Sequence, residues 1–176
     1  VDTLGFELTD YFLSSPMVVL LFTVLVLAGV VNAVNIIDGY NGLMAGYSIL
    51  VLFAIAYVAN ILGDSLILQL SLMLGSSLMG FFIFNFPFGK LFMGDGGAYF
   101  VGFMMAIIGL MLSTRNEEVS HWFILLLFIY PLYETVFSIY RKKIVRGTSP
   151  SQPDGYHLHM LIYKRLVKCK TFKNNK

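Results

Sequence analysis

Long apolar runs separated by short polar stretches dominate the hydrophobic pattern of this chain. The runs cover residues 16–34, 43–62, 66–85, 98–112 and 121–140. A helix of about 20 residues crosses a hydrocarbon core of about 30 Å. None of the runs alternates with the period of two that is typical of barrel strands. The pattern therefore predicts an all-α, polytopic membrane protein with about five transmembrane helices.

The composition agrees with a membrane protein. Of the 176 residues, 57% are hydrophobic and 12% are charged, whereas about a quarter of the residues in soluble domains are charged. The opening stretch VDTLGFELTDYF is acidic and lacks the basic region of a signal peptide. Cys169 is the one cysteine of the chain, so no disulfide can form within it.

The basic residues predict the orientation in the membrane. They gather after the last apolar run, from Arg141 onward, and Lys90 falls on the same side if the helices alternate. Because cytoplasmic loops are enriched in lysine and arginine, residues 141–176 are expected to form a cytoplasmic basic loop and tail. The loops that follow the first and third runs then also face the cytoplasm, from a plasma (inner) membrane.

The first polar segment, NAVNIIDGYNG, follows the first apolar run. Asn32, Asn35 and Asp38 recur three residues apart, so they would form one polar ridge for as long as the helix continues. Asp38-Gly39 and Asn41-Gly42 predict turns. The asparagines could simply join helices and Asp-Gly could end one, but so many polar groups at the edge of lipid favour a functional site.

The second polar segment, FNFPFGKLFMGDGGAYF, places Asp95 between glycines just before the next predicted helix. Gly94 and its neighbours would let a phosphate or a metal ion approach the backbone closely. The segment could also be only a turn. With Asp38 on the same membrane face, however, two carboxylates could share a hard cation such as Mg²⁺.

The third polar segment, PDGYHLHM, follows the basic run. His157 and His159 stand two residues apart after a Pro-Asp-Gly turn, where imidazoles could meet a phosphate. A metal site there is less favoured, because few nitrogen ligands and no nearby cysteine are available. The apolar spacing over residues 158–166 predicts a short cytoplasmic helix at the membrane interface.

Other polar positions carry less information. Glu134 is an acid inside a predicted helix, and we expect it to pair with Arg141 or to face the same cavity as Asp38 and Asp95. The loops on the opposite face, Gly63-Asp64 and residues 113–120, are expected to hold little.

Together, NAVNIIDGYNGL, FMGDGGAYFVGF and PDGYHLHM, in this order, closely resemble the polyprenyl-phosphate N-acetylhexosamine-1-phosphate transferases of glycosyltransferase family 4. The resemblance spans nearly the whole chain. It implies transfer of a sugar 1-phosphate from a UDP-N-acetylhexosamine to undecaprenyl phosphate or another polyprenyl phosphate, with release of UMP and with Mg²⁺, or Mn²⁺ in its place. The product would begin a cell-envelope glycan, such as peptidoglycan, the O-antigen of lipopolysaccharide or a cell-wall teichoic acid linkage unit.

The resemblance also assigns roles to residues. Asp95 would bind the metal, with Asp38 and Asn35 shaping the metal and nucleotide-sugar pocket, while the histidines would contact phosphates. The catalytic set is Asp38, Asp95, His157 and His159, of which Asp38 and Asp95 are the metal ligands; the substrate-binding set is Asn32, Asn35, Gly94, Arg141 and Arg146.

The chain departs from the family pattern at three positions. Asn41 stands where an aspartate is common, Ala98 where a serine is common, and Met160 where a histidine is common. Family members also carry helices and an aspartate pair upstream. Residues 1–176 are therefore expected to form one membrane-embedded domain, the C-terminal half of a larger transferase that is inactive without the rest.

Two other interpretations stay open. In one, the chain is a transporter or channel fragment whose acidic residues line an ion path, although such sites tend to lie near the bilayer midplane. In the other, it is a non-catalytic, degenerate family member, as the changes at Asn41 and Met160 would allow. The expected partners are the UDP-sugar, the lipid phosphate and the membrane, with no nucleic acid; a homodimer is compatible with this reading.

Overall fold

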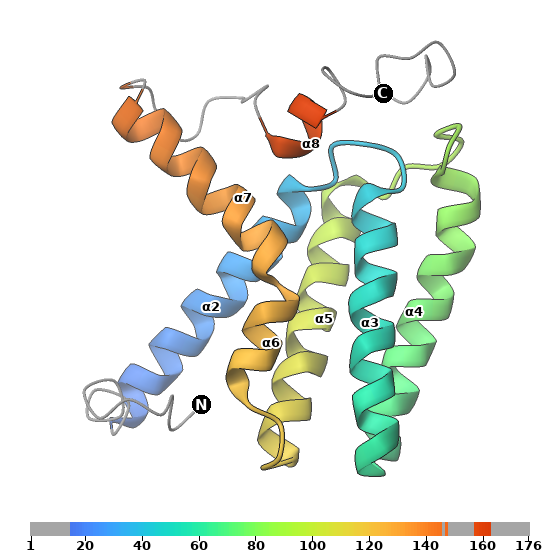
Figure 1. Ribbon diagram of the computed structural model, residues 1–176, viewed down its shortest axis with the longest axis vertical. Coiled ribbons are helices and arrows are strands. Elements are labelled where there is room, and N and C mark those ends of the chain that lie inside the picture. The colour runs from blue at the N-terminus through green and yellow to red at the C-terminus, as the bar shows by residue number, and fades with distance from the viewer. Residues whose placement is uncertain (1–14, 146, 148–156, 163–176) are drawn as a thin grey trace.

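The computed structural model describes residues 15–145, 147 and 157–162, and in these ranges it contains helices and turns but no strand. The elements are α2 (Pro16–Ile36), α3 (Leu43–Leu62), α4 (Ser65–Asn85), α5 (Gly94–Arg115), α6 (His121–Leu127), α7 (Ile129–Tyr140), the π-helical turn η1 (Arg141–Val145) and α8 (Leu158–Ile162) (Figure 1). The prediction of an all-α fold is confirmed.

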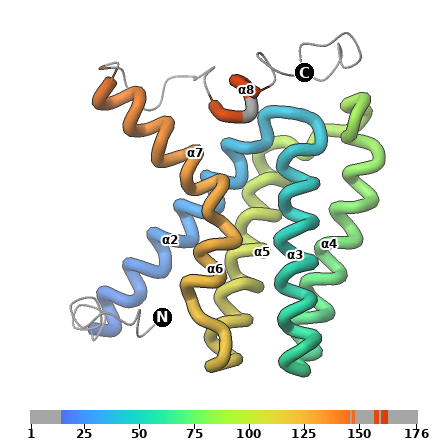
Figure 2. Tube along the Cα trace, viewed as in Figure 1, coloured from blue at the N-terminus to red at the C-terminus, as the bar shows by residue number. Residues whose placement is uncertain are grey.

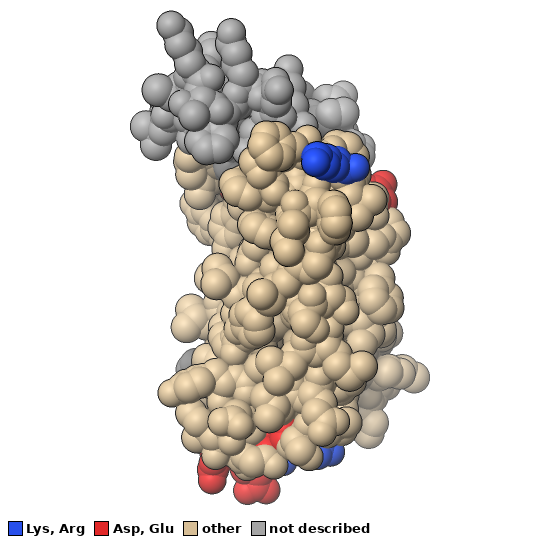
Figure 3. Space-filling view, turned by 90° about the vertical axis from the view of Figure 1, so that its right-hand side faces the viewer, with Lys and Arg blue, Asp and Glu red and all other residues tan. Residues whose placement is uncertain are grey.

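Four helices, α2 to α5, are long and apolar enough to cross a membrane. The bent pair α6 and α7 makes a fifth span if the two are counted together. Figure 3 shows the same division on one face of the molecule, where charged side chains lie towards the two ends and a broad uncharged belt separates them. A belt of this kind matches the hydrocarbon layer of a bilayer.

The helices pack in two pairs, with α3 against α4 and α2 against α5, and α7 crosses α2 (Figure 2). Gly102 of α5 permits the close approach of α2. A Cβ atom at Gly102 would lie 3.2 Å from the Cα atom of Val31 and 3.1 Å from the Cβ atom of Val34. Lipid offers no hydrophobic driving force for helix association, so membrane helices associate through close packing, which small residues at the contact permit.

The last apolar run is broken, so the prediction of one continuous helix over 121–140 was wrong. α6 and α7 meet at an angle of 68°, next to Pro131. Proline has no N–H group and its ring crowds the carbonyl four residues earlier, which here belongs to Leu127. That carbonyl instead accepts a hydrogen bond of 2.6 Å from the Tyr47 hydroxyl of α3. The bond gives the Leu127 carbonyl a hydrogen-bond donor, which lipid could not supply.

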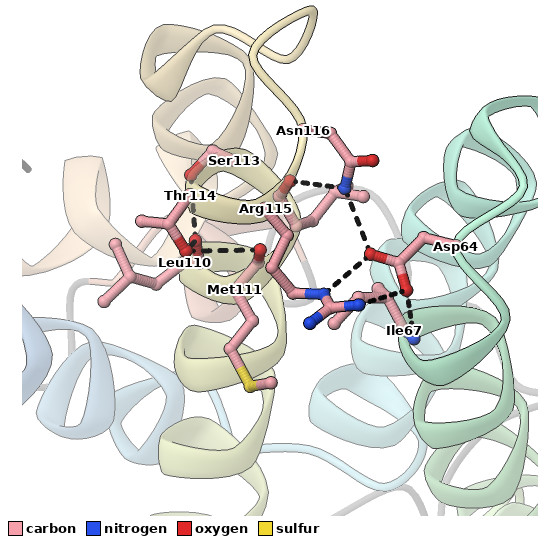
Figure 4. A network of polar contacts seen from close by, with 9 residues as sticks. Asp64, Ile67, Leu110, Met111, Ser113, Thr114, Arg115 and Asn116 are labelled. Carbon is pink, nitrogen blue, oxygen red and sulfur yellow. Dashed lines mark hydrogen bonds and ion pairs between the residues drawn. The ribbon is translucent and has the colours of Figure 1, made fainter.

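A polar network joins α4 and α5 at the end of the bundle opposite the sequence motifs (Figure 4). The Asp64 carboxylate accepts hydrogen bonds from Arg115 at 2.8 and 3.3 Å, from Asn116 at 3.2 Å and from the backbone N–H of Ile67 at 3.3 Å. The arginine lowers the pKa of Asp64 to about 2, and Asn116 and the Ile67 N–H act in the same direction. The expectation that these loops hold little was therefore wrong.

Candidate functional site

The first motif forms the end of α2 and the turn into α3. The helix ends at Ile36, and the N–H of Asp38 donates to the Asn35 carbonyl at 3.1 Å, so Asp38 lies in the turn. The predicted ridge therefore stops before Asp38. Asn32 is exposed and its amide donates to the carbonyl of Ala28 at 2.8 Å, whereas Asn35 and Asp38 are half-buried.

The second motif forms the start of α5. This helix begins at Gly94, earlier than the predicted residue 98, so Asp95 belongs to its first turn. Gly94 has a φ of 69°, a backbone conformation that glycine adopts without strain. Asp95 is exposed, and a carboxylate in the first turn of a helix is favoured by the helix dipole. The tight glycine turn thus presents this carboxylate at the end of the bundle.

Two asparagines fasten these loops to each other. The Asn85 side chain accepts a hydrogen bond of 2.5 Å from the N–H of Gly42 and donates one of 2.7 Å to the carbonyl of Leu91. The Asn41 amide donates to the Pro87 carbonyl at 3.3 Å. We call these three hydrogen bonds the loop clasp. It holds the turn that carries Asp38 against the loop that precedes Asp95.

The loop clasp gives a physical reason for asparagine at position 41. An ionised aspartate has no N–H group and could not donate to the Pro87 carbonyl. Gly89 leaves room for this amide, because a Cβ atom at position 89 would lie only 2.7 Å from the Asn41 amide nitrogen. Position 41 therefore contributes to the shape of the site through its amide.

Asp95 is close enough to Asp38 for its charge to act on the Asp38 carboxyl. Partial burial, and then the charge of Asp95, raise the pKa of Asp38 to about 6. Excess negative charge in a partly desolvated place is relieved by a cation. Within the described ranges no group of three or more His, Cys, Asp or Glu side chains could hold a metal ion. The donor set nevertheless fits Mg²⁺, which uses one or two carboxylates and takes its other oxygens from water and substrate phosphates.

The third motif reaches the same end of the bundle through α8 (Figure 1). His157 immediately precedes α8, and its Nδ1 atom lies 3.3 Å from the Glu134 carboxylate of α7. The other carboxylate oxygen accepts the N–H of Leu158 at 2.8 Å. Glu134 thus pairs with His157 and the Leu158 N–H, whereas Arg141 was one of its two expected alternatives. Arg141 instead places its guanidinium 5.5 Å from the centre of the Phe137 ring.

Two predicted site residues lie outside what the structure describes, namely Arg146 and the side chain of His159. Asp38, Gly94 and Asp95 lie in or directly beside the two loops that are fastened to each other, and His157 lies in the segment held by Glu134. Asn32 and Asn35 belong to the last turns of α2, and Arg141 follows α7. An apolar pocket of about 190 Å³ lies elsewhere, lined by residues of α2, α5, α6 and α7 that include Val26, Leu110 and Trp122. Its apolar lining does not suit a phosphate.

Asn85 and Glu134 are the residues near the site that sequence reasoning left out of the catalytic and substrate-binding sets. Asn85 is 5% exposed and Glu134 is 2% exposed. A polar or ionisable residue inside an apolar run is costly in a membrane and needs a partner. Their position in the hydrophobic pattern was thus the available signal, but the sequence could not show which partner each would find.

Comparison with known proteins identifies a family that this chain matches and several similar enzymes. Residues 2–113 match the model of a protein family described as glycosyl transferase family 4. This chain belongs to that family. The match covers the motifs that carry Asp38 and Asp95, so it supports the resemblance on which their roles were assigned. No solved structure matches the chain.

Individual relatives carry the names of two kinds of transferase. A probable undecaprenyl-phosphate N-acetylglucosaminyl 1-phosphate transferase of Bacillus subtilis is 38% identical over 138 residues, which is 78% of this chain and 38% of the relative. An undecaprenyl-phosphate alpha-N-acetylglucosaminyl 1-phosphate transferase of Thermotoga maritima is 28% identical, over 85% of the chain and 45% of the relative. A phospho-N-acetylmuramoyl-pentapeptide-transferase of Streptococcus thermophilus is 30% identical, over 80% and 42%. The chain thus spans less than half the length of these relatives.

Proposed function

We propose that the full-length protein transfers an N-acetylhexosamine 1-phosphate from a UDP-sugar to a polyprenyl phosphate and releases UMP. The observation that carries the proposal is the arrangement of Asp38 and Asp95. Asp38 lies in the turn after α2 and Asp95 in the first turn of α5, the charge of Asp95 contributes to the raised pKa of Asp38, and the loop clasp joins the two segments at one end of a membrane bundle. The names of the related family 4 enzymes support the reaction class.

The reaction joins two anionic phosphates. An oxygen of the lipid phosphate would attack the phosphorus that carries the sugar, and a new P–O–P linkage would form. The bond from that phosphorus to the oxygen bridging to UMP would break, and UMP would leave with this oxygen and the bonding electron pair. Such transfers need charge neutralisation and alignment more than covalent help from the protein.

Each part of the site would serve that need. Asp38 and Asp95 would hold Mg²⁺, which when bound supplies the positive charge that the phosphate oxygens require. His157, with His159 nearby in the chain, would contact a phosphate, and Asn35 would help to shape the nucleotide-sugar pocket. Arg141 and Arg146 would add positive charge, while Gly94 leaves the backbone accessible to a phosphate.

We further propose that this end of the bundle faces the cytoplasm. Arg141, Lys142 and Lys143 continue directly from α7 at this end, as the distribution of positive charge on cytoplasmic loops requires. UDP-sugars are cytosolic, and the phosphate of a membrane lipid lies at the headgroup level, so both substrates would meet there. The acidic residues of an ion path would instead extend towards the bilayer midplane.

The test uses the full-length protein in membranes with Mg²⁺, undecaprenyl phosphate and radiolabelled UDP-N-acetylglucosamine. Wild type is compared with Asp95→Asn and with the control Glu118→Gln, because Glu118 is an exposed carboxylate at the opposite end of the bundle. Label should enter the lipid fraction with wild type and the control. It should fall at least about 100-fold with Asp95→Asn, as when a group that stabilises transition-state charge is removed.

Two results would contradict the proposal. Folded wild-type protein that labels no lipid with any of a panel of UDP-N-acetylhexosamines would leave a non-catalytic or transport role. Asp95→Asn protein with full activity would refute the assigned metal site while leaving the reaction in place.

A further inference from the structure

Glu134 is an unusual residue for its position in the chain. It lies in α7, within an otherwise uncharged stretch, and it is 2% exposed. A buried carboxylate in a membrane segment is expensive unless it is paired. Both of its oxygens are used, one by the N–H of Leu158 at 2.8 Å and the other by Nδ1 of His157 at 3.3 Å. The whole carboxylate is therefore directed at the segment that carries the third motif.

The two contacts divide into a structural one and a chemical one. Accepting the Leu158 N–H anchors the start of α8, and a neutral amide oxygen could do this as well. The contact with His157 is different, because the hydrogen bond made by one imidazole nitrogen sets the tautomer and orientation of the ring. A carboxylate at Nδ1 favours a proton there, so Nε2 becomes the nitrogen that presents its lone pair or, once protonated, a second N–H.

We propose that Glu134 is a positioning residue that holds His157, through Nδ1, in the tautomer and orientation in which Nε2 serves a substrate phosphate. This inference rests on the proposed function and adds a specific task for a residue outside the sequence motifs. It parallels the carboxylates that orient ligand histidines in metal sites, whose loss typically costs 10–100-fold. The bend between α6 and α7 makes the contact available, because it sets the direction of the helix that carries Glu134.

The activity test is a double-mutant cycle in the full-length protein, with Glu134→Gln, His157→Ala and the double variant. Glutamine keeps an oxygen for the Leu158 N–H but removes the charge that orients the imidazole. We expect Glu134→Gln to lower kcat by about 10–100-fold, with KM for the UDP-sugar within about twofold. In the His157→Ala background the same change should cost less than about twofold, because the two side chains act as one unit.

A second readout does not depend on turnover. Nitrogen NMR of ¹⁵N-histidine-labelled protein reports which ring nitrogen carries the proton, and the His157 signals are assigned by their loss in His157→Ala. Wild type should show a protonated Nδ1 atom. Glu134→Gln should shift the ring towards the Nε2–H tautomer, whereas the control Glu118→Gln should leave the wild-type pattern unchanged.

The outcomes separate this inference from the proposed function. If wild type transfers no label, the proposed function fails, and the NMR comparison still shows whether Glu134 sets the tautomer of His157. If wild type is active but Glu134→Gln costs the same in both backgrounds, Glu134 does not act through His157. An unchanged His157 spectrum in Glu134→Gln would overturn the inference as well.

Discussion

The hydrogen bond between Tyr47 and the Leu127 carbonyl should stabilise the break between α6 and α7. Pro131 cannot donate to this carbonyl, so Tyr47→Phe would leave it without the 2.6 Å bond from α3. Leaving a buried acceptor unpaired costs about 1–3 kcal/mol, whereas measured hydrogen bonds between membrane helices average about 0.6 and reach about 1.7 kcal/mol. The short distance places the expected loss in the upper part of that range, at about 1–1.7 kcal/mol.

The assay is reversible unfolding of the purified protein in mixed micelles with increasing SDS. The decisive comparison uses Pro131→Ala, because alanine restores a backbone N–H that can donate to the Leu127 carbonyl. Tyr47→Phe should then cost less than about 0.5 kcal/mol in the Pro131→Ala background. Tyr57→Phe is the matched control, since Tyr57 is 68% exposed on the same helix.

An equal cost of Tyr47→Phe in both backgrounds would show that the Tyr47 hydroxyl does not stabilise the break at Pro131. Tyr47 would then stabilise the fold through its ring, which packs 5.9 Å from that of Tyr130, and not by replacing the donor that proline lacks.

Three further predictions concern the fold and the site. Arg115 and the other donors lower the pKa of Asp64 to about 2 from an ordinary value of 3.8. This carboxylate should therefore stabilise the protein above about pH 4 and lose that effect as the pH falls towards 2. The unfolding temperature of Asp64→Asn should fall less than that of wild type over this pH window. Gly102→Ala should lower the unfolding temperature, because the new Cβ atom would contact α2. Gly80→Ala should leave the unfolding temperature equal or raise it, because no atom lies within 4 Å of a Cβ there. Equal losses in the two variants would contradict the packing role of Gly102. Asn85→Ala removes two hydrogen bonds of the loop clasp. It should lower the rate of Mg²⁺-dependent transfer by at least about tenfold, which corresponds to about 1.4 kcal/mol. An unchanged dependence of the rate on Mg²⁺ would show that the clasp does not position the carboxylates.

The hydrophobic pattern was sufficient to predict α2, α3 and α4 and the presence of α5. Apolar runs of membrane length have few alternatives to a helix, because lipid leaves no other way to pair the backbone. The start of α5 was predicted too late because glycines usually mark loops. At Gly94 the chain instead turns directly into the helix, and the helix dipole favours Asp95 in its first turn. The break at Pro131 carried a clear local signal, but the partner of the Leu127 carbonyl lies on a distant helix.

The site was predictable as a set of motifs and not as a set of contacts. Asp38 and Asp95 could be assigned to one membrane face from spacing and topology. The loop clasp could not, because the partners of Asn85 and Asn41 are mostly backbone groups brought together by helix packing. Glu134 shows the same limit. Its position indicated that it needed a partner, but only the placement of α8 identifies that partner as His157.

In the proposed reaction the sugar and its phosphate move together to the lipid. The direct measurement incubates the full-length protein with Mg²⁺, undecaprenyl phosphate and UDP-N-acetylglucosamine labelled with ³²P at the phosphate that bears the sugar. We predict that the ³²P enters the lipid fraction in step with the release of unlabelled UMP. Sugar that reached the lipid while the ³²P left as UDP would contradict phosphosugar transfer and with it the roles proposed for Asp38 and Asp95.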